Sequence, residues 1–224
     1  MNSGSWTRPS LAVTCTPAEF EAALVDRRCE HLALGLHPWQ LNAQNACELV
    51  EAFAHQLPKT RLVGEIGLDF YGDFAQSSSA QLNAFNSVCA QLEDSGYLLS
   101  LHSRKAEREL LDILEANGLT RSCICILHAY NGSSAGLTRA IESGCLFSFG
   151  LRELKTKRGR EYARQLPATR LLLETDADGH EPFSPQDQER SLEDALELLN
   201  SIRGCDMREQ IADNFCRAME FALE

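Results

Sequence analysis

The stretch RLVGEIGLDF, residues 61–70, is an apolar run that carries a carboxylate at Glu65. Three further runs share this design: YLLSLHSR carries His102, ICILHAYNGS carries His128, and RLLLETDAD carries Asp176. Near-continuous apolar runs of this length are typical of strands buried in a parallel sheet. The carboxyl ends of such strands are where α/β enzymes, barrels above all, place the side chains that do their chemistry.

Strand-like and helix-like segments alternate along nearly the whole chain. This alternation predicts a parallel sheet covered by helices. Polar side chains at the ends of many successive strands favour a closed barrel, because an open doubly wound sheet binds its ligand at one switch point. The seven predicted strand ends are Thr14, His37, Glu65, His102, His128, Gly150 and Asp176.

A complete eight-stranded barrel typically takes about 250 residues, and this chain has 224. We therefore predict an α/β fold of the TIM-type (β/α) barrel class that is incomplete, with seven strands and the first βα unit missing. The predicted domain organisation is a single barrel domain over residues 11–224. Residues 1–10 are expected to form an irregular or disordered tail.

The composition is that of an ordinary globular protein, with 44% hydrophobic and 24% charged residues. No apolar stretch approaches the roughly 20 residues that cross a bilayer, and the first residues lack the apolar core of a signal peptide. We therefore expect a cytoplasmic location, no membrane partner and no obligate protein partner. Nine cysteines then predict reduced thiols, and Cys123 and Cys125 are expected to pack in the core rather than bind a metal.

The formal net charge of −11 disfavours electrostatic binding of nucleic acid over a broad surface. It leaves room for a small site that cuts the end of a phosphodiester chain, because bound divalent ions neutralise local acidic charge.

Each of the four strand-end side chains has an ordinary structural explanation when taken alone. A buried Glu65 or Asp176 could form a salt bridge or cap a loop, and His102 or His128 could be a hydrogen-bonded core histidine. Four ligand-type residues in four separate βα units favour a metal centre instead. Side chains alternate between the two faces of a strand. We therefore expect Glu65 to share a face with Val63 and Gly67, and Asp176 to share one with Glu174. In the same way, His102 should share a face with Ser100, and His128 with Ile124 and Ile126.

The ligand types indicate hydrolytic chemistry. Histidine and carboxylate ligands hold Zn²⁺, Mn²⁺ or Mg²⁺ and leave positions open for water, and a bridging carboxylate such as Glu65 could hold two ions about 4 Å apart. The sequence contains no G-x-S-x-G, no Walker loop and no G-x-G-x-x-G. Acyl-serine, nucleoside triphosphate and dinucleotide chemistry therefore lack support.

At these residues the chain resembles the TatD family of metal-dependent deoxyribonucleases, within the amidohydrolase-like barrels. The resemblance runs from about Leu11 to the C-terminus, and its motifs are GLHP at 35–38, GEIGLDF at 64–70, LHSR at 101–104, HAYNGS at 128–133 and LLLETD at 171–176. It implies that Glu65 bridges two metal ions and that His102 and His128 complete one site. It also implies that Asp176 serves the other site and helps to activate water, so that Glu65 and Asp176 are the expected catalytic residues.

Beyond these ligands, the resemblance places His37 in the substrate pocket, and Arg104 of LHSR is a further candidate there. A basic stretch, LRELKTKRGR at 151–160, follows a predicted strand end. Its Lys155, Lys157 and Arg158 are candidates for contact with substrate phosphate; a solvated loop and helix start explains them equally well.

The chain departs from the family pattern at its start, because family members open with a strand carrying H-x-H and no H-x-H occurs in this sequence. The first strand, Leu11–Thr14, resembles the family's second. The resemblance thus implies one bound divalent ion, or none, where the family holds two, and impaired hydrolysis. Unpaired strand edges at Leu11–Thr14 and Arg170–Thr175 would favour self-association.

Three interpretations of function remain open at this stage. The favoured one is metal-dependent hydrolysis of phosphodiester bonds by metal-activated water, as in a DNA exonuclease. The second is a related barrel hydrolase that acts on a small ester, lactone, amide or phosphoester. The third is a catalytically inactive remnant that binds a partner.

Overall fold

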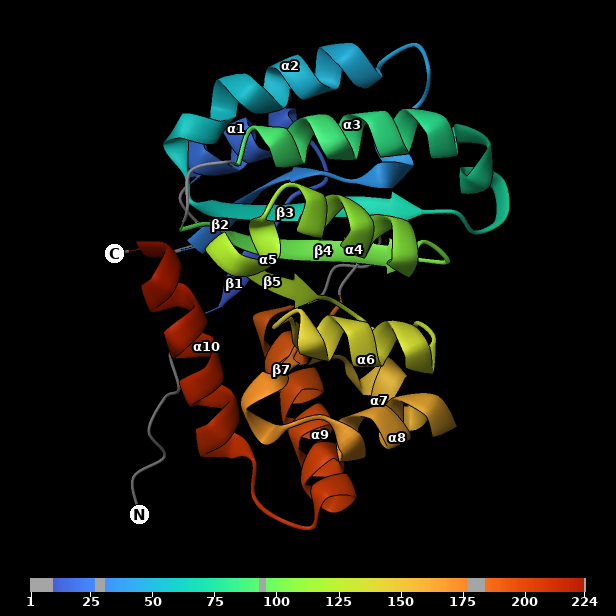
Figure 1. Cartoon of the computed structure of the whole chain (residues 1–224). Coiled ribbons are helices and arrows are strands. Elements are labelled where there is room, and N and C mark those ends of the chain that lie inside the picture. The colour runs from blue at the N-terminus through green and yellow to red at the C-terminus, as the bar shows by residue number, and fades with distance from the viewer. Residues whose placement is uncertain (1–9, 27–30, 93–95, 177–183, 224) are drawn as a thin grey trace.

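The sheet holds seven parallel strands in the order of the sequence, β1-β2-β3-β4-β5-β6-β7 (Figure 1). The computed structural model describes residues 10–26, 31–92, 96–176 and 184–223. The sheet curls into a partial barrel, which confirms the predicted α/β class and the count of seven strands. The strands are β1 (Leu11–Val13), β2 (His31–Leu36), β3 (Leu62–Asp69), β4 (Leu98–Arg104), β5 (Ile124–Leu127), β6 (Leu146–Phe149) and β7 (Leu171–Leu173).

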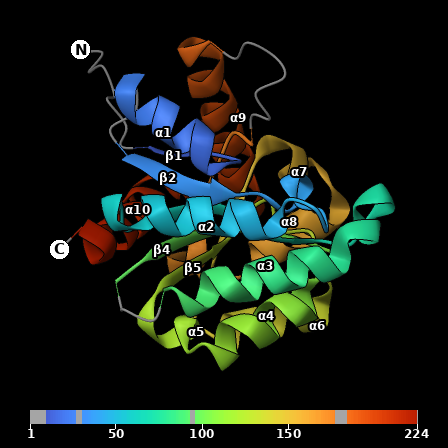
Figure 2. The same ribbon diagram turned by 90° about the horizontal axis from the view of Figure 1, so that it is seen from above.

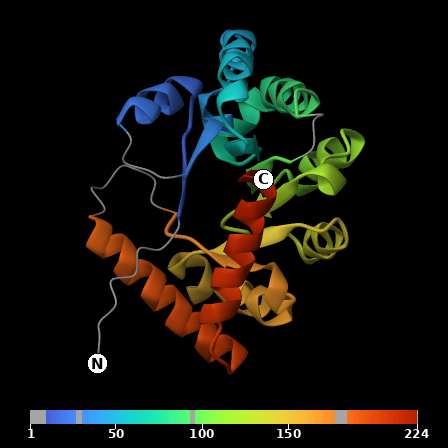
Figure 3. The ribbon, with the colours of Figure 1, turned by 90° about the vertical axis from the view of Figure 1, so that its left-hand side faces the viewer.

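Helices follow the strands and form a ring around the outer face of the sheet (Figures 2 and 3). The α-helices are α1 (Pro17–Asp26), α2 (Ala46–Gln56), α3 (Ser78–Ala90), α4 (Glu107–Ala116), α5 (Leu119–Ser122), α6 (Ser134–Glu142), α7 (Leu151–Lys155), α8 (Lys157–Gln165), α9 (Pro185–Arg203) and α10 (Arg208–Leu223). Four 3₁₀ helices join them: η1 (Pro38–Gln40), η2 (Leu57–Lys59), η3 (Gly72–Ser77) and η4 (Ala168–Arg170).

Local sequence signals account for the helix ends. Ser184 caps α9 by accepting a hydrogen bond from the backbone N–H of Asp187, Pro185 occupies the first turn, and Gly204 ends the helix in a left-handed conformation at φ 69°. Ser133 caps α6 and Thr156 caps α8 in the same way. These caps satisfy backbone donors that a helix leaves unpaired at its start.

The two faces of the sheet bury separate apolar clusters. The outward-facing side chains, such as Leu34, Leu99 and Phe147, pack against the surrounding helices. The inward-facing side chains at the strand starts pack against α10, which lies across the middle of the ring (Figure 3). This inner cluster consists of Ala33, Leu62, Leu98, Ile126, Leu146, Leu172, Ala218, Met219 and Ala222. The amino-terminal end of the barrel is thus closed by helix α10, and the carboxyl end is left for polar side chains.

One expected strand face is wrong. Val63 lies in the outer cluster with Ile66 and Leu68, and not on the inner side with Glu65. The pairing of β3 with β4 shifts register between Val63 and Ile66, which breaks the two-residue alternation at this point. The irregularity turns Glu65 into the barrel while keeping the apolar residues on both sides of it outside.

Within the described residues, β1 and β7 each pair with one neighbour only, so the sheet has two free edges. The predicted tail lies outside the described residues except for Ser10. Cys123 and Cys125 are buried free thiols, and Sγ of Cys125 lies 3.8 Å from the backbone oxygen of Leu119, as expected for core packing. In the described ranges, no helix is long and apolar enough to cross a membrane.

Candidate metal centre

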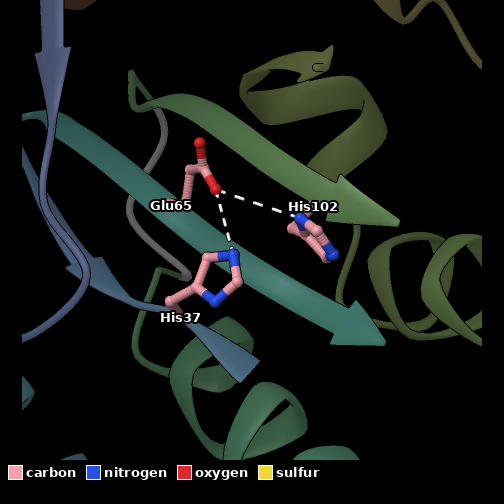
Figure 4. Close-up of side chains that lie close together, drawn as sticks. All are labelled: His37, Glu65 and His102. Atoms are coloured by element: carbon pink, nitrogen blue, oxygen red, sulfur yellow. Dashed lines mark ion pairs between the residues drawn. The ribbon is translucent and has the colours of Figure 1, made fainter. Parts of the chain in front are cut away.

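The carboxylate of Glu65 lies among three imidazoles inside the carboxyl end of the sheet. Its Oε2 is 3.1 Å from Nε2 of His37, 3.4 Å from Nε2 of His128 and 3.9 Å from Nδ1 of His102. Figure 4 shows the carboxylate reaching toward His37 and His102 from β3. The structure therefore brings the candidate ligands of β3, β4 and the end of β5 to one point.

Three of these atoms are spaced as ligands of one ion. Nδ1 of His102 and Nε2 of His128 are 3.1 Å apart, and both lie within 3.9 Å of Oε2 of Glu65. Ligands that each lie about 2.1 Å from one metal ion are about 3 to 3.4 Å apart, so a small adjustment of side chains would suffice. The donor set of two nitrogens and one oxygen fits Zn²⁺ or Mn²⁺.

Glycine at position 67 allows β3 and β4 to approach closely enough for this geometry. Gly67 pairs with His102 in the register of the two strands and has a φ of 144°. A Cβ at Gly67 would overlap the backbone oxygen of His102. Any side chain there would push apart the strands that carry Glu65 and His102.

Asp69 is a buried member of the site that the sequence analysis missed. It is 0% exposed, and its Oδ2 accepts a hydrogen bond from Trp39 Nε1 at 2.7 Å and lies 3.1 Å from His102 Nε2. Its Oδ1 accepts from the backbone N–H of Tyr71 at 2.9 Å. A carboxylate in this position orients a metal-binding imidazole and assigns the proton to Nε2, which leaves the Nδ1 lone pair of His102 free.

His37 is arranged as a hydrogen-bond donor. Its Nδ1 accepts from the backbone N–H of Trp39 at 3.3 Å, so the ring proton lies on Nε2 and points to Glu65. A protonated ring nitrogen has no lone pair for a metal. His37, Glu65 and His102 lie close enough together to hold an ion. In this group His37 therefore orients Glu65, and His102 is the histidine that can act as a metal ligand.

A second, more acidic group lies beside the first. Nδ1 of His128 is 3.8 Å from Oε1 of Glu174 and 4.0 Å from Oδ1 of Asp176. The buried Oε1 of Glu174 has no hydrogen-bond donor among the described residues, while its Oε2 accepts from Ser148. An acceptor buried without a donor favours a nearby cation. Glu65–His128–Asp176 and Glu153–Glu174–Asp176 are each close enough to hold one.

The pKa values follow from this crowding of charge. Burial opposes the ionisation of Glu65, but His128, His37 and His102 outweigh it and lower the pKa of Glu65 to about 2. Burial also opposes the charging of His128, yet Glu65, Glu174 and Asp176 raise its pKa to about 9. Burial raises the pKa of Asp176 to about 6, and the neighbouring carboxylates add to that rise. Without an ion, His128 is therefore the internal cation of the site.

Arg152 was also missed by the sequence analysis. Its guanidinium pairs with Asp176 and, at 2.8 Å, with Oε1 of Glu153. Its side chain remains 74% exposed, so it can move away from the carboxylates at little cost.

The predicted pocket residues other than His37 lie at the end of β4 and on the helices that follow β6. The guanidinium of Arg104 lies 3.9 Å from the centre of the Tyr71 ring, at the end of β4. Lys155, Lys157 and Arg158 are exposed on α7 and α8, which follow β6. Arg158 donates a hydrogen bond at 3.0 Å to the backbone oxygen of Asn131, in the loop after His128. The basic stretch therefore borders the site from the outside.

A parallel, barrel-like sheet whose carboxyl ends bring histidines and carboxylates together is an arrangement that metal-dependent hydrolases use. The comparisons with known proteins name the family. The chain belongs to the TatD-related DNase family, whose model matches residues 10–220.

Named relatives agree with this assignment. The metal-dependent hydrolase TatD of Mycobacterium tuberculosis is 33% identical over 165 residues, which are 70% of this chain and 61% of that protein. The 3'-5' ssDNA/RNA exonuclease TatD of Erwinia amylovora is 32% identical over 151 residues, 64% of this chain and 56% of that protein. The chain thus spans about three fifths of the length of these relatives.

Solved structures show the same fold. The crystal structure of the TatD homologue YjjV from Escherichia coli superposes with a TM-score of 0.76 at 23% identity, covering 95% of this chain and 85% of that one. A TatD family hydrolase from Entamoeba histolytica gives a TM-score of 0.71 at 16% identity, over 93% and 83% of the two chains.

Proposed function

We propose that this chain hydrolyses phosphodiester bonds at the ends of single-stranded nucleic acid and that the reaction depends on divalent metal ions. One observation carries the proposal: Glu65 Oε2, His102 Nδ1 and His128 Nε2 converge at ligand spacing. The named activity of the Erwinia relative supports the choice of substrate. Family membership supports the reaction class.

In the proposed arrangement, Glu65, His102 and His128 would hold one ion, for which Zn²⁺ or Mn²⁺ fits the donor set. Glu65 and Asp176 would contribute ligands to a second ion. Ions held in this way would lower the pKa of a bound water and stabilise negative charge on a phosphoryl oxygen.

The protein's own groups have separate tasks. Asp69 keeps the proton of His102 on Nε2, and His37 holds Glu65 by donating from its own Nε2. Asp176, which lies beside His128 and Glu174 at the mouth of the site, is the proposed general base and would accept a proton from the attacking water.

Positive charge for the substrate comes from the rim of the site. In this proposal Arg104, which lies over the ring of Tyr71, and the exposed Lys155, Lys157 and Arg158 would contact phosphates of the chain that leads into the site. Such contacts neutralise charge and confer no sequence preference.

Metal analysis and an exonuclease assay together test the proposal. The purified chain is dialysed against Mn²⁺ or Zn²⁺, and bound metal is measured by elemental analysis, with hydrolysis of end-labelled single-stranded DNA measured on the same sample. We expect at least one ion per chain and metal-dependent release of nucleotides. Asp176→Asn should lower the rate at least about 100-fold, whereas Asp213→Asn, an exposed aspartate on α10, should not change it.

The outcome separates the competing interpretations. A rate unaffected by Asp176→Asn would refute the assigned site. Hydrolysis of a small ester that single-stranded DNA does not inhibit would favour a small-molecule hydrolase. Absence of bound metal together with absence of any hydrolysis would favour a binding protein without catalysis.

A further inference from the structure

A cavity of about 460 Å³ opens beside the metal centre and contains none of its candidate ligands. It lies where the chain leaves β2 and β3, because its lining comes from η1, η3 and the residues that follow them. Ligand pockets in proteins typically measure about 300 to 1,000 Å³ and combine aromatic walls with a few polar groups. The residues used below are Trp39, Asn42, Gln44, Asp73, Phe74 and Gln76.

Trp39 connects the cavity to the metal centre. Its indole nitrogen donates to Asp69, which in turn contacts His102. The centre of its ring is 4.7 Å from that of His37 and 5.8 Å from that of His102. A group bound against Trp39 would therefore be separated from the imidazoles of His37 and His102 by a single side chain.

Two aromatic rings that stack on each other form one wall of the cavity, so that a base can stack on an outer face of this pair. The rings of Trp39 and Phe74 stack with centres 4.9 Å apart and an angle of 6° between their planes. Trp39 is 43% exposed although it is a large apolar side chain. Exposed aromatic rings at nucleic-acid sites stack on bases, because every base has a flat face of similar size.

The remaining lining mixes apolar residues, such as Leu41 and Ala43, with polar ones, and it carries no positive charge. The side chains of Asn42, Gln44 and Gln76 supply amide donors and acceptors, which match the edge of a base. Among the lining residues there is one carboxylate, Asp73, and no lysine or arginine. A phosphate would be repelled here, whereas an uncharged planar group would not.

We propose that this cavity binds a nucleobase of the single-stranded substrate, from the nucleotide next to the phosphodiester bond at the metal centre. The proposal rests on the proposed function, since it assumes a nucleic-acid substrate. The base stacks on the Trp39–Phe74 wall and bonds through its edge to the amides, while its phosphates remain with the metal ions and the basic rim. The cavity thereby distinguishes nucleic acid from other phosphoesters.

Intrinsic fluorescence gives a direct test, because the chain contains two tryptophans. The variant Trp6→Phe leaves Trp39 as the single reporter. Thymidine trinucleotide with phosphorothioate linkages, which resist hydrolysis, is titrated into this variant after loading with Zn²⁺. An otherwise identical trinucleotide without bases is titrated in parallel. We expect the thymidine form to quench Trp39 and the form without bases to leave it unchanged.

Substitutions on the wall sharpen the test. Phe74→Ala should weaken binding of the thymidine trinucleotide about 5- to 150-fold, the range expected for the loss of one stacking partner. Gln76→Ala, which removes an amide and leaves the wall intact, should weaken it less. Phe221→Ala, an exposed phenylalanine on α10, is the matched control and should have no effect.

The two proposals fail in distinguishable ways. Equal quenching by both trinucleotides, or none by either, would overturn the base-binding cavity even if the metal-loaded chain hydrolyses DNA. Base-dependent quenching that Phe74→Ala weakens would support the cavity even if the metal-loaded chain hydrolyses no nucleic acid, and then only the proposed catalysis would fail.

Discussion

Replacing Asp69 by Asn tests whether a buried carboxylate sets the proton position on His102. Oδ2 of Asp69 faces two donors, Trp39 Nε1 and His102 Nε2, and Oδ1 faces a third, the backbone N–H of Tyr71. An amide presents only one oxygen. If that oxygen faces Trp39 and His102, the amide NH₂ opposes the N–H of Tyr71. In the other orientation the NH₂ faces His102 Nε2, and the ring must shift its proton to Nδ1, the proposed metal ligand.

The size of the effect follows from these two options. Loss of a carboxylate that orients a metal-binding histidine typically costs 10- to 100-fold in metal affinity, which is about 1.4 to 2.7 kcal/mol. The unpaired N–H of Tyr71 in the first orientation would cost about 1 to 3 kcal/mol of folding stability. We therefore expect both weaker metal binding and a lower melting temperature, with metal affinity affected whichever orientation the amide adopts.

The assay is competition for Zn²⁺ between a chromophoric chelator and the metal-stripped protein, with thermal melting on the same samples. Asp73→Asn is the matched control. It removes the same charge from an exposed aspartate four residues further along the chain. Trp39→Phe removes one donor to Asp69 and keeps the bond to His102, so its metal affinity should fall less. Zinc affinity for Asp69→Asn within twofold of the wild type, in a folded protein, would refute the reasoning.

Three further predictions concern stability and substrate binding. Gly67→Ala should destabilise the fold by at least about 2 kcal/mol in urea unfolding, because it combines backbone strain with overlap of the new Cβ and the backbone of His102. The control is Gly72→Ala, at a φ of 59° with open space around it, which should cost only about 1 kcal/mol. Equal costs would contradict the close approach of β3 and β4. In the metal-free protein, the pKa of His128 is raised from 6.5 to about 9. The protonated ring therefore adds at most about 3 kcal/mol to the free energy of unfolding. This stabilisation is complete below pH 6.5 and is lost as the pH rises through 9. His128→Asn should flatten the measured unfolding free energy over that range. Replacing Lys155, Lys157 and Arg158 together by Ala should weaken single-stranded DNA binding and reduce its salt slope by about 2; an unchanged slope would show that these cations are merely solvated.

The sequence predicted the fold because apolar strands and their spacing are local signals. Strand and helix positions follow from runs such as LLSLH and from caps such as Ser184, which act within a few residues. The same signals placed Glu65, His102, His128 and Asp176 at one end of the sheet, and the structure brings all four together. Their roles as ligands stay predictions.

What the sequence did not predict depends on register between strands. Asp69 lies four residues beyond the expected strand end at Glu65, and β3 in fact extends to it. Its contact with His102 arises only because Gly67, and not Asp69, pairs with His102. The inward turn of Glu65 likewise depends on the irregular pairing near Val63. No local pattern reports such offsets, since they are set by the neighbouring strand.

Helix α10 gives the partial barrel an unusual mechanical property. In the part of the chain that the structure describes, no set of hydrogen bonds joins β1 to β7 and closes the curved sheet. At the amino-terminal end, Met219 of α10 belongs to the same buried apolar cluster as Ala33 of β2 and Leu172 of β7, and α10 itself contacts β4, β5 and β7. Glu65 and Asp176 lie at the far end of the strands. A substitution that changes the volume of the α10 side chains in this cluster is therefore expected to alter the distance between the two carboxylates without touching either.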